Sequence, residues 1–496
     1  MIRRFVTAAA LVLASFVGWG TVSSPAHAAD LSAFLNQELT WSDCGGLQCT
    51  WVTVPLDYSQ PDGATIRLRV NRDRTSDPST HVGSIVINPG GPGVSGLGFT
   101  SYVASLLSSE VTAQYDVVGF DPRSVGKSDP VKCMSDAYAV KWLNTDITPD
   151  TTSEEHTLLN RAAGIGAGCV KYTPAITMHD STLDAARDLD IIRAALREDK
   201  LNYLGFSYGT YLGTQYAGLF PTNVGRLVLD GALDPTLDAM ALSEGQSDGF
   251  QLAVKRFMSD CLTRASCPFS GSTSHALKEL NAFLTGLDDA PLRARPGQPL
   301  VQSQGIGAVF GSLYATWQWP NLREALASAL DDGNGRALQS LAFNSSDRTV
   351  SGRFLTNMQS AFLAIGCTDT VAPPKRSGLA KAAKQWSKGV KVPELARAMS
   401  WGNAPCAYWP VSAATPANPV RADGTPPILV IGTKYDPATP LSWAKALANQ
   451  LAAGSLLQYN GDGHTAFGGS SNCVDSAVDQ FFLTGTPPPD GKVCKH

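Results

Sequence analysis

The sequence has little charge and no strong excess of either sign. Charged residues make up 17% of its 496 residues, and the formal net charge is -4 at pH 7. Proteins that grip nucleic acid through its phosphates carry clustered positive charge, so this composition argues against a nucleic-acid partner. Beyond residue 28 the sequence has no apolar run long enough to span a bilayer. We therefore expect no stable membrane association.

Cysteine spacings typical of metal sites are also absent. The sequence contains no Cys-x-x-Cys pair and no cluster of histidine with cysteine, so we expect no metal site. In an exported protein cysteines form disulfides by default, and pairing each cysteine with its nearest neighbour uses all ten. The predicted couples are Cys44 with Cys49, Cys133 with Cys169, Cys261 with Cys267, Cys367 with Cys406, and Cys473 with Cys494.

The N-terminal residues have the pattern of an export signal. Two arginines in "MIRRF" precede a short apolar run, and a small-x-small site ends at Ala28. This pattern predicts a signal peptide over residues 1–28, cleaved before Ala29, and hence a secreted, extracellular protein. A retained membrane anchor is the alternative, but the apolar run is short for one.

The rest of the chain alternates apolar runs with helical patterns. Such alternation predicts a mostly parallel sheet with helices on both faces, whose strands are apolar because both faces are buried. We expect two strands with a turn in 49–74, further strands in 83–93, 115–129, 201–207, 225–233 and 425–440, a last strand in 455–468, and helices over 181–198, 208–220 and 441–452.

Two segments interrupt this rhythm. Residues 236–414 are mostly helical in pattern, and we interpret them as a cap inserted over the carboxyl ends of the strands. The predicted core domain then comprises residues 29–235 and 415–496. A smaller excursion over 133–178 is closed by its own pair of cysteines.

One serine stands between a predicted strand and a predicted helix. Ser207 lies in "GFSYG", residues 205–209. A Gly-x-Ser-x-Gly match alone is common in a chain rich in glycine and serine. At a sharp strand-to-helix turn, however, it exposes the hydroxyl above the sheet, and Gly205 and Gly209 avoid collisions there. We predict that Ser207 is a nucleophile.

A serine nucleophile needs a base, and the base needs an orienting acid. Among seven histidines only His464 follows a late core strand, in "GDGHTAFG". Asp436 ends the preceding strand, whereas Asp462 shares the loop of the histidine and is poorly placed to hold the ring from behind. We predict His464 as base and Asp436 as acid, although Asp436 also suits a helix cap. The rate should fall as His464 protonates, roughly below pH 6.

The oxyanion of an acyl-transfer reaction needs backbone N–H donors. One is expected from Tyr208, directly after the nucleophile. The other is expected from the glycine-rich loop "NPGGPG", where we favour Gly91 with Gly90 next. A merely structural turn is the alternative for this loop.

Taken together, these motifs resemble the secreted tripeptidyl aminopeptidases of actinobacteria, relatives of the proline iminopeptidases among the α/β-hydrolases. The resemblance covers nearly the whole mature chain. Asn88 stands where proline iminopeptidases open the glycine loop with histidine, which fits the tripeptidyl branch better. The main stretches of this sequence that carry the resemblance are "VTVPLDY", "NPGGPGVSG", "DPRSVGKSD", "GFSYGTYLGTQYAGLFP", "GTKYDPATP" and "GDGH".

The resemblance implies an α/β-hydrolase fold with the triad predicted above and a helical cap that admits only the N-terminal end of a peptide. In proline iminopeptidases cap carboxylates bind the free amine. Glu244, Asp248 and Asp369 are candidates here, although each also suits a solvated or structural role. Thr439 shapes the site or begins a helix.

The expected activity is that of a secreted, monomeric serine exopeptidase, without cofactor, acting on peptides with a free N-terminus. It would release tripeptides or other short peptides through an acyl-enzyme. A proline iminopeptidase, and a carboxylesterase or lipase with the same triad, are the alternatives. A non-catalytic binding protein is disfavoured because all three triad residues are present.

Overall fold

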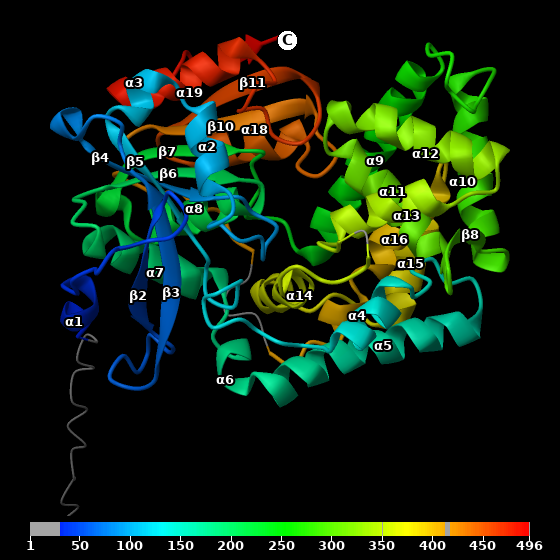
Figure 1. The fold of residues 1–496 in the computed structure, drawn as a ribbon, viewed down its shortest axis with the longest axis horizontal. Coiled ribbons are helices and arrows are strands. Elements are labelled where there is room, and N and C mark those ends of the chain that lie inside the picture. The colour runs from blue at the N-terminus through cyan, green and yellow to red at the C-terminus, as the bar shows by residue number, and fades with distance from the viewer. Residues whose placement is uncertain (1–29, 350, 412–416, 496) are drawn as a thin grey trace, which may run out of the picture.

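The protein is described here by a computed structural model covering residues 30–349, 351–411 and 417–495 (Figure 1). The predicted signal peptide lies outside the described residues. A central sheet with helices on both faces occupies one side of the molecule, and a helical lobe lies beside it. The predicted α/β-hydrolase class is confirmed by this arrangement.

The sheet has the strand order β1-β2-β3-β5-β4-β6-β7-β10-β11-β12. Pairing is antiparallel from β1 to β5 and parallel from β5 onwards. The strands are Ser42–Asp43 (β1), Gln48–Pro55 (β2), Thr65–Asp73 (β3), Gly83–Asn88 (β4), Tyr115–Phe120 (β5), Leu201–Phe206 (β6), Val224–Asp230 (β7), Ile428–Tyr435 (β10), Gly454–Asp462 (β11) and Lys492–Cys494 (β12).

The central strands are apolar because helices cover both of their faces. Every residue of β4 and β5 is buried. Along β4, Val86 points to one core, and Ile85 and Ile87 point to the other. The first face is covered by Thr182–Ala195 (α7), Tyr208–Leu219 (α8) and Leu441–Gln450 (α18), and the second by Thr100–Leu106 (α2), Ser109–Thr112 (α3) and Asn472–Thr484 (α19).

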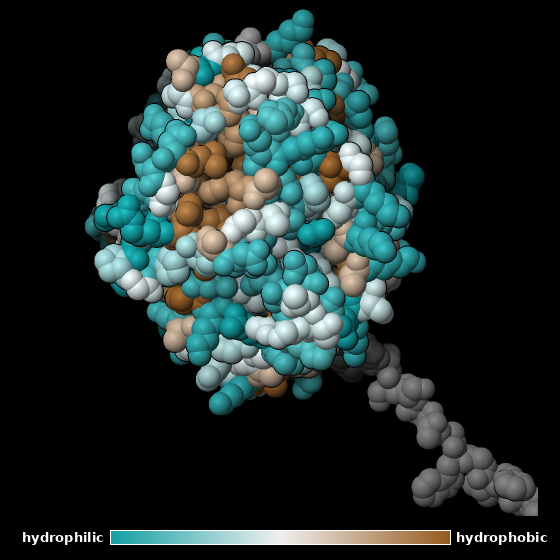
Figure 2. All heavy atoms as spheres, turned by 90° about the vertical axis from the view of Figure 1, so that its right-hand side faces the viewer, coloured by the Kyte–Doolittle hydropathy of each residue, from teal (hydrophilic) through white to brown (hydrophobic). Residues whose placement is uncertain are grey.

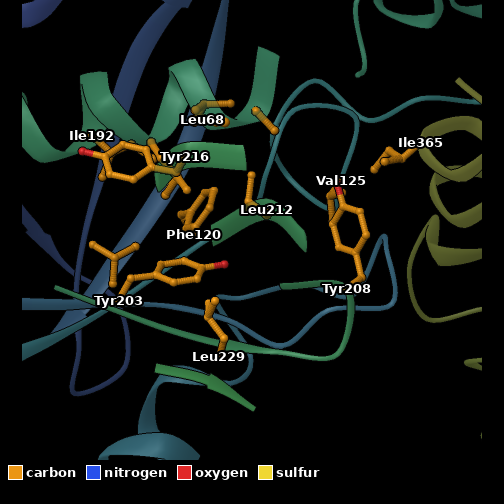
Figure 3. Close-up of a cluster of buried hydrophobic side chains, with 14 of the residues drawn as sticks. Leu68, Phe120, Val125, Ile192, Tyr203, Tyr208, Leu212, Tyr216, Leu229 and Ile365 are labelled. Atoms are coloured by element: carbon orange, nitrogen blue, oxygen red, sulfur yellow. The ribbon is translucent and has the colours of Figure 1, made fainter. Parts of the chain in front are cut away.

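Figure 3 shows part of the first core, in which side chains from the strands meet those of α7 and α8. Tyr203 is fully buried, and its hydroxyl donates to the carbonyl of Gly209 at 2.8 Å. This bond ties β6 to the first turn of α8. The core therefore fixes the strand-to-helix turn that carries Ser207.

The segment between β7 and β10 is mainly helical and has its own apolar core. It also contains a small hairpin, Leu292–Arg295 (β8) with Gln298–Leu300 (β9), which the sequence pattern did not indicate. Its helices are Ala239–Cys261 (α9), Thr273–Asp289 (α10), Gln302–Leu313 (α11), Trp319–Asp331 (α12), Arg336–Ser345 (α13), Met358–Asp369 (α14), Arg376–Trp386 (α15), Pro393–Trp401 (α16) and Ala404–Ala407 (α17).

The excursion over 133–178 joins this helical lobe rather than standing apart. Leu158 and Leu159 pack with Leu379 and Trp401 in a shared apolar cluster. The lobe is thus built from two separate parts of the chain. The excursion contains Asp136–Leu143 (α4), Thr152–Tyr172 (α5) and Pro174–Thr177 (α6), and the remaining short helices are Ser32–Leu35 (α1), Pro78–Thr80 (η1), Pro221–Asn223 (η2) and Thr316–Gln318 (η3).

All five predicted cysteine couples form disulfides. The last one, Cys473–Cys494, joins α19 to β12. The sequence analysis placed the last strand at 455–468, so β12 is an additional edge strand that was not predicted. Within the described ranges, no helix is sufficiently long and apolar to cross a membrane.

The outer face of the helical lobe is largely hydrophilic with one group of hydrophobic residues (Figure 2). Among the side chains that remain exposed on the lobe are Tyr314 at 40% and Phe362 at 50%. Isolated apolar residues of this kind are normal on a globular surface. These two nevertheless lie beside the candidate site described next.

Candidate active site

Ser207 sits in a strained turn directly after β6. Its φ of 55° and ψ of -122° are unusual for a residue with a side chain. Neither Gly205 nor Gly209 leaves room for a side chain in this turn. A Cβ on Gly205 would lie 2.4 Å from the carbonyl oxygen of Gly209, and one on Gly209 would lie 2.6 Å from that of Asn88. The steric reason predicted for the two glycines is confirmed.

The hydroxyl of Ser207 takes no part in capping α8, although the residue occupies the N-cap position. Its N–H donates to the carbonyl of Asp230 at the end of the neighbouring strand, at 2.9 Å. The backbone is therefore held while the side-chain oxygen stays available. This is the arrangement that a nucleophile on a strand-to-helix turn requires.

His464 and Asp436 lie in direct contact. Nδ1 of His464 is 2.9 Å from both carboxylate oxygens, and the Asp436 side chain is completely buried. The carboxylate also accepts from the N–H groups of Ala438 and Thr439, each at 2.8 Å, and from the Thr439 hydroxyl at 3.0 Å. Asp436 thus orders its own loop and the histidine together, and Thr439 fixes the orientation of the acid.

The imidazole lies against the residue that follows Asp230, the partner of the Ser207 N–H. Gly231, the residue after Asp230, approaches the ring so closely that a Cβ there would lie 3.3 Å from Cε1 of His464. Nε2 of His464 is buried and finds no hydrogen-bond partner within the described parts of the chain. A buried nitrogen without a hydrogen-bond partner lowers the stability of the fold, so its presence calls for a functional explanation. Accepting a proton during catalysis is such a function.

The helical lobe contributes to holding this histidine. The carbonyl of Tyr314, just after α11, accepts the N–H of His464 at 2.7 Å. The ring of Tyr314 stands perpendicular to the imidazole with 5.2 Å between centroids. Burial alone would lower the pKa of His464, but the Asp436 carboxylate outweighs it, so that the pKa is raised above 6.5. If His464 is the predicted base, the acid side of the rate profile should lie above the range near pH 6 expected from the sequence.

Asp462 does not contact the imidazole. Its carboxylate pairs with the guanidinium of Arg256 on α9, with 2.7 Å between Nη2 and Oδ2. The interpretation of Asp462 as a decoy agrees with this placement.

The glycine-rich loop after β4 reaches the nucleophile turn. A Cβ on Gly90 would lie 3.1 Å from the backbone nitrogen of Tyr208, the first residue of α8. The N–H of Gly90 donates to Oδ1 of Asn88 at 2.9 Å, so it is already used. This favours Gly91 over Gly90 as the second donor beside Tyr208.

One of the three acids considered for amine binding is linked to the nucleophile turn. Asp369, at the end of α14, accepts from the N–H and hydroxyl of Thr182 at 2.7 and 2.5 Å. The same hydroxyl contacts the phenol of Tyr208. Burial raises the pKa of Asp369 to about 7. Burial, together with the charge of Asp369, raises the pKa of Asp180 to about 8.

The other two acids, Glu244 and Asp248, are exposed on α9. This helix passes close to the loop of the predicted acid, since a Cβ on Gly249 would lie 2.5 Å from the carbonyl oxygen of Pro437. They are therefore near the site, but among the described residues no hydrogen bond or ion pair links them to it.

Two other features of the molecule are distant from this chemistry. Carboxylate oxygens of the half-buried Asp146, Glu154 and Asp288 lie within 4.8 Å of one another in the helical lobe, and such a cluster is not by itself a metal site. A hollow of about 810 Å³ lies at the amino ends of the strands, against Asn202 and Arg226. In a parallel α/β sheet the functional crevice lies at the carboxyl ends instead.

Sequence reasoning missed two residues that hold the histidine loop. Asp230 has a visible signal, because it is a carboxylate that ends a core strand in "VLDG". Tyr314 has none, because it lies at the end of one helix among many in the insertion. Only the fold brings it to His464.

Comparisons with known proteins identify relatives of the whole chain. A family model described as TAP-like protein matches residues 392–494. The serine protease Hip1 of Mycobacterium tuberculosis is 35% identical over 488 residues, covering 93% of this chain and 91% of that protein. The tripeptidyl aminopeptidase of Streptomyces lividans is 32% identical over 465 residues, covering 90% and 84%. Carboxylesterase B of Mycobacterium tuberculosis is 33% identical over 458 residues, covering 90% and 86%.

Proposed function

We propose that this chain, which belongs to the tripeptidyl-aminopeptidase-like family of α/β-hydrolase serine peptidases, is a secreted exopeptidase releasing tripeptides or other short peptides from free N-termini. The observation that supports this best is the buried Asp436–His464 pair, whose Nε2 has no partner among the described residues and whose ring lies against Gly231, next to the residue that holds the strained Ser207 turn. Relatives named serine protease and tripeptidyl aminopeptidase favour a peptide substrate.

In the proposed reaction Ser207 Oγ attacks the carbonyl carbon of the cleaved bond while Nε2 of His464 takes its proton. His464 then gives this proton to the leaving amine, and the acyl-enzyme forms. Water attacks the acyl-enzyme in the same way, with His464 again as base. Asp436 keeps the proton of the neutral imidazole on Nδ1 and stabilises the imidazolium.

The oxyanion formed in each step would be held by the N–H groups of Tyr208 and Gly91. Tyr208 is the first residue of α8, so the positive end of the helix dipole adds to its effect. The loss of one such donor typically costs about 3 kcal/mol of transition-state stabilisation.

For the free amine of the substrate we favour Asp369 over Glu244 and Asp248. It is linked through Thr182 to Tyr208, beside the nucleophile, whereas the other two acids are solvated on α9. A substrate ammonium beside Asp369 would favour the ionised carboxylate and offset its burial.

Secretion is supported by the disulfides. Five of them hold the described chain, a number typical of oxidising compartments and rare in the cytosol of mesophiles. We propose that the chain is exported by residues 1–28 and acts as a monomer on extracellular peptides.

The test compares three chromogenic anilides on the purified mature protein: a free-amine tripeptide, its N-acetylated twin and a single-residue prolyl compound. Rapid cleavage of the free tripeptide alone, lost in Ser207→Ala, is the expected result. Preference for the prolyl compound would instead identify a proline iminopeptidase. The Asp369→Asn variant should raise KM for the free tripeptide much more than the control Glu244→Gln.

An esterase is the second candidate, because one relative of similar identity is named carboxylesterase B. The same triad would serve this reaction, and only the acyl and leaving groups would differ. Fast hydrolysis of simple acyl esters without anilide cleavage, or indifference to acetylation of the tripeptide, would reject the exopeptidase and favour the esterase.

A further inference from the structure

A second carboxylate lies behind the loop that carries His464. Asp230 ends β7 and is 0% exposed. Its Oδ2 accepts the N–H groups of Ala466 at 2.9 Å and Phe467 at 2.8 Å, and its Oδ1 lies 3.1 Å from the nitrogen of Ala466. These two amides follow His464 by two and three residues. The carboxylate therefore clamps the loop just beyond the histidine.

The neighbours of Asp230 in the adjoining strands are apolar. Its partners in the neighbouring strands are Phe206 of β6 and Ile431 of β10, both buried. The titratable groups whose charges act on it are His464 and Asp436. His464 is the cation that acts on Asp230 most strongly.

Burial raises the pKa of Asp230 to about 7, against the effect of the two amides. Positive charge on His464 favours its ionised form, and its negative charge in turn raises the pKa of His464. The two groups therefore stabilise each other most when the imidazole carries a proton. That is the state His464 passes through while Ser207 attacks.

We infer that Asp230 is a positioning residue for the reaction proposed above: it holds the His464 loop and supplies a second negative charge behind the imidazolium. The proton still moves only from Ser207 Oγ to Nε2 and on to the leaving group. Asp230 neither gives nor takes it. Asp436 orients the ring by direct contact, and Asp230 acts through the loop and through charge.

The decisive variant is Asp230→Asn, because its amide oxygen can still accept both N–H groups while the charge is lost. We expect kcat/KM to fall about tenfold on the plateau, because the imidazolium loses one stabilising charge. For the same reason the midpoint of the acid limb should move to lower pH by roughly one unit. The melting temperature shows whether the variant folds.

The matched control is Asp462→Asn. It also removes a carboxylate that anchors this loop, but Asp462 is paired with Arg256 rather than acting on His464. Its acid limb should coincide with that of the wild type. If the acid limb of the rate profile of Asp230→Asn also coincides with that of the wild type, Asp230 is only a structural anchor and the inference is overturned. This holds whatever the plateau rate of the variant.

A second measurement needs no variant. In wild-type protein labelled with carbon-13 at histidine Cε1, the His464 resonance should titrate with a midpoint above 6.5, because both carboxylates favour the imidazolium. A midpoint below 6.5 would contradict the inference even if Asp230→Asn failed to fold. Failure of the proposed function would be seen separately, as activity retained in Ser207→Ala. The acid limbs of the rate profiles are measured with whichever anilide or ester the wild type hydrolyses.

Discussion

Replacing Asp436 by asparagine should force His464 into the wrong tautomer. Oδ1 of Asp436 accepts the N–H groups of Ala438 and Thr439 at 2.8 Å each. An asparagine should keep its carbonyl oxygen there, because an NH2 group would face two N–H donors at 2.8 Å. At the place of Oδ2 it would face one longer N–H contact, from Thr465 at 3.2 Å, and a Thr439 hydroxyl that can rotate. The NH2 group then takes the place of Oδ2, next to Nδ1 of His464. It donates to Nδ1, and the proton of the neutral ring moves to Nε2.

A histidine protonated on Nε2 cannot accept the proton of Ser207. We therefore expect Asp436→Asn to lower kcat about 10⁴-fold, or about 5.5 kcal/mol, as in other enzymes in which this tautomer is lost. The assay is hydrolysis of the best anilide or ester on the plateau of the wild-type rate profile, above its acid limb. Asp462→Asn is the control and should remain within about fivefold of the wild type.

The melting temperature of Asp436→Asn must be measured as well, because Asp436 also orders its own loop. A folded variant that keeps more than a tenth of the wild-type kcat would refute the reasoning. The histidine would then be oriented by something other than this carboxylate, and its contact with Asp436 would be structural.

Three further predictions test other parts of the structure. The midpoint of the acid limb of kcat/KM should lie above 6.5, because the pKa of His464 is raised and only the neutral ring accepts a proton; a midpoint below that value would contradict this. Gly90→Ala should lower kcat about a hundredfold, because the added Cβ would lie 2.4 Å from the carbonyl oxygen of Phe206, the residue before Ser207. The control is Gly98→Ala, which should match the wild type because nothing lies within 4 Å of a Cβ at that position. Asp188→Asn should lower the free energy of unfolding, measured by urea denaturation, by about 3–5 kcal/mol. The reason is that the fully buried Arg123 loses the carboxylate to which it donates two hydrogen bonds. A loss below about 1 kcal/mol would show that the backbone carbonyls around Arg123 are enough to hold its charge.

Features set by neighbouring residues could be predicted from the sequence. The core strands are continuous apolar runs, the cysteine couples are close in sequence, and the Ser207 turn is marked by its own glycines. Each of these depends on contacts within a short stretch or on a regular period. For this reason the sheet, the disulfides and the place of Ser207 between β6 and α8 were predictable.

Features set by distant residues were not. The hairpin of β8 and β9 and the edge strand β12 are short, and their positions depend on what they pack against. The docking of 133–178 onto the insertion rests on apolar contacts such as Leu158 with Leu379, which leave no periodic signal. Asp230 and Tyr314 reach His464 only through the sheet order and the placement of the lobe.

The contacts that hold His464 come from both parts of the molecule. From the sheet side, Asp436 binds Nδ1 and Asp230 binds the amides that follow the histidine. From the helical lobe, the carbonyl of Tyr314 accepts the His464 N–H, and Arg256 on α9 pairs with the end of β11 just before it. A movement of the lobe would therefore shift His464, the base of the proposed reaction. Substitutions in the lobe that displace the Tyr314 carbonyl should lower kcat and not only raise KM, because this carbonyl holds the backbone of His464 itself.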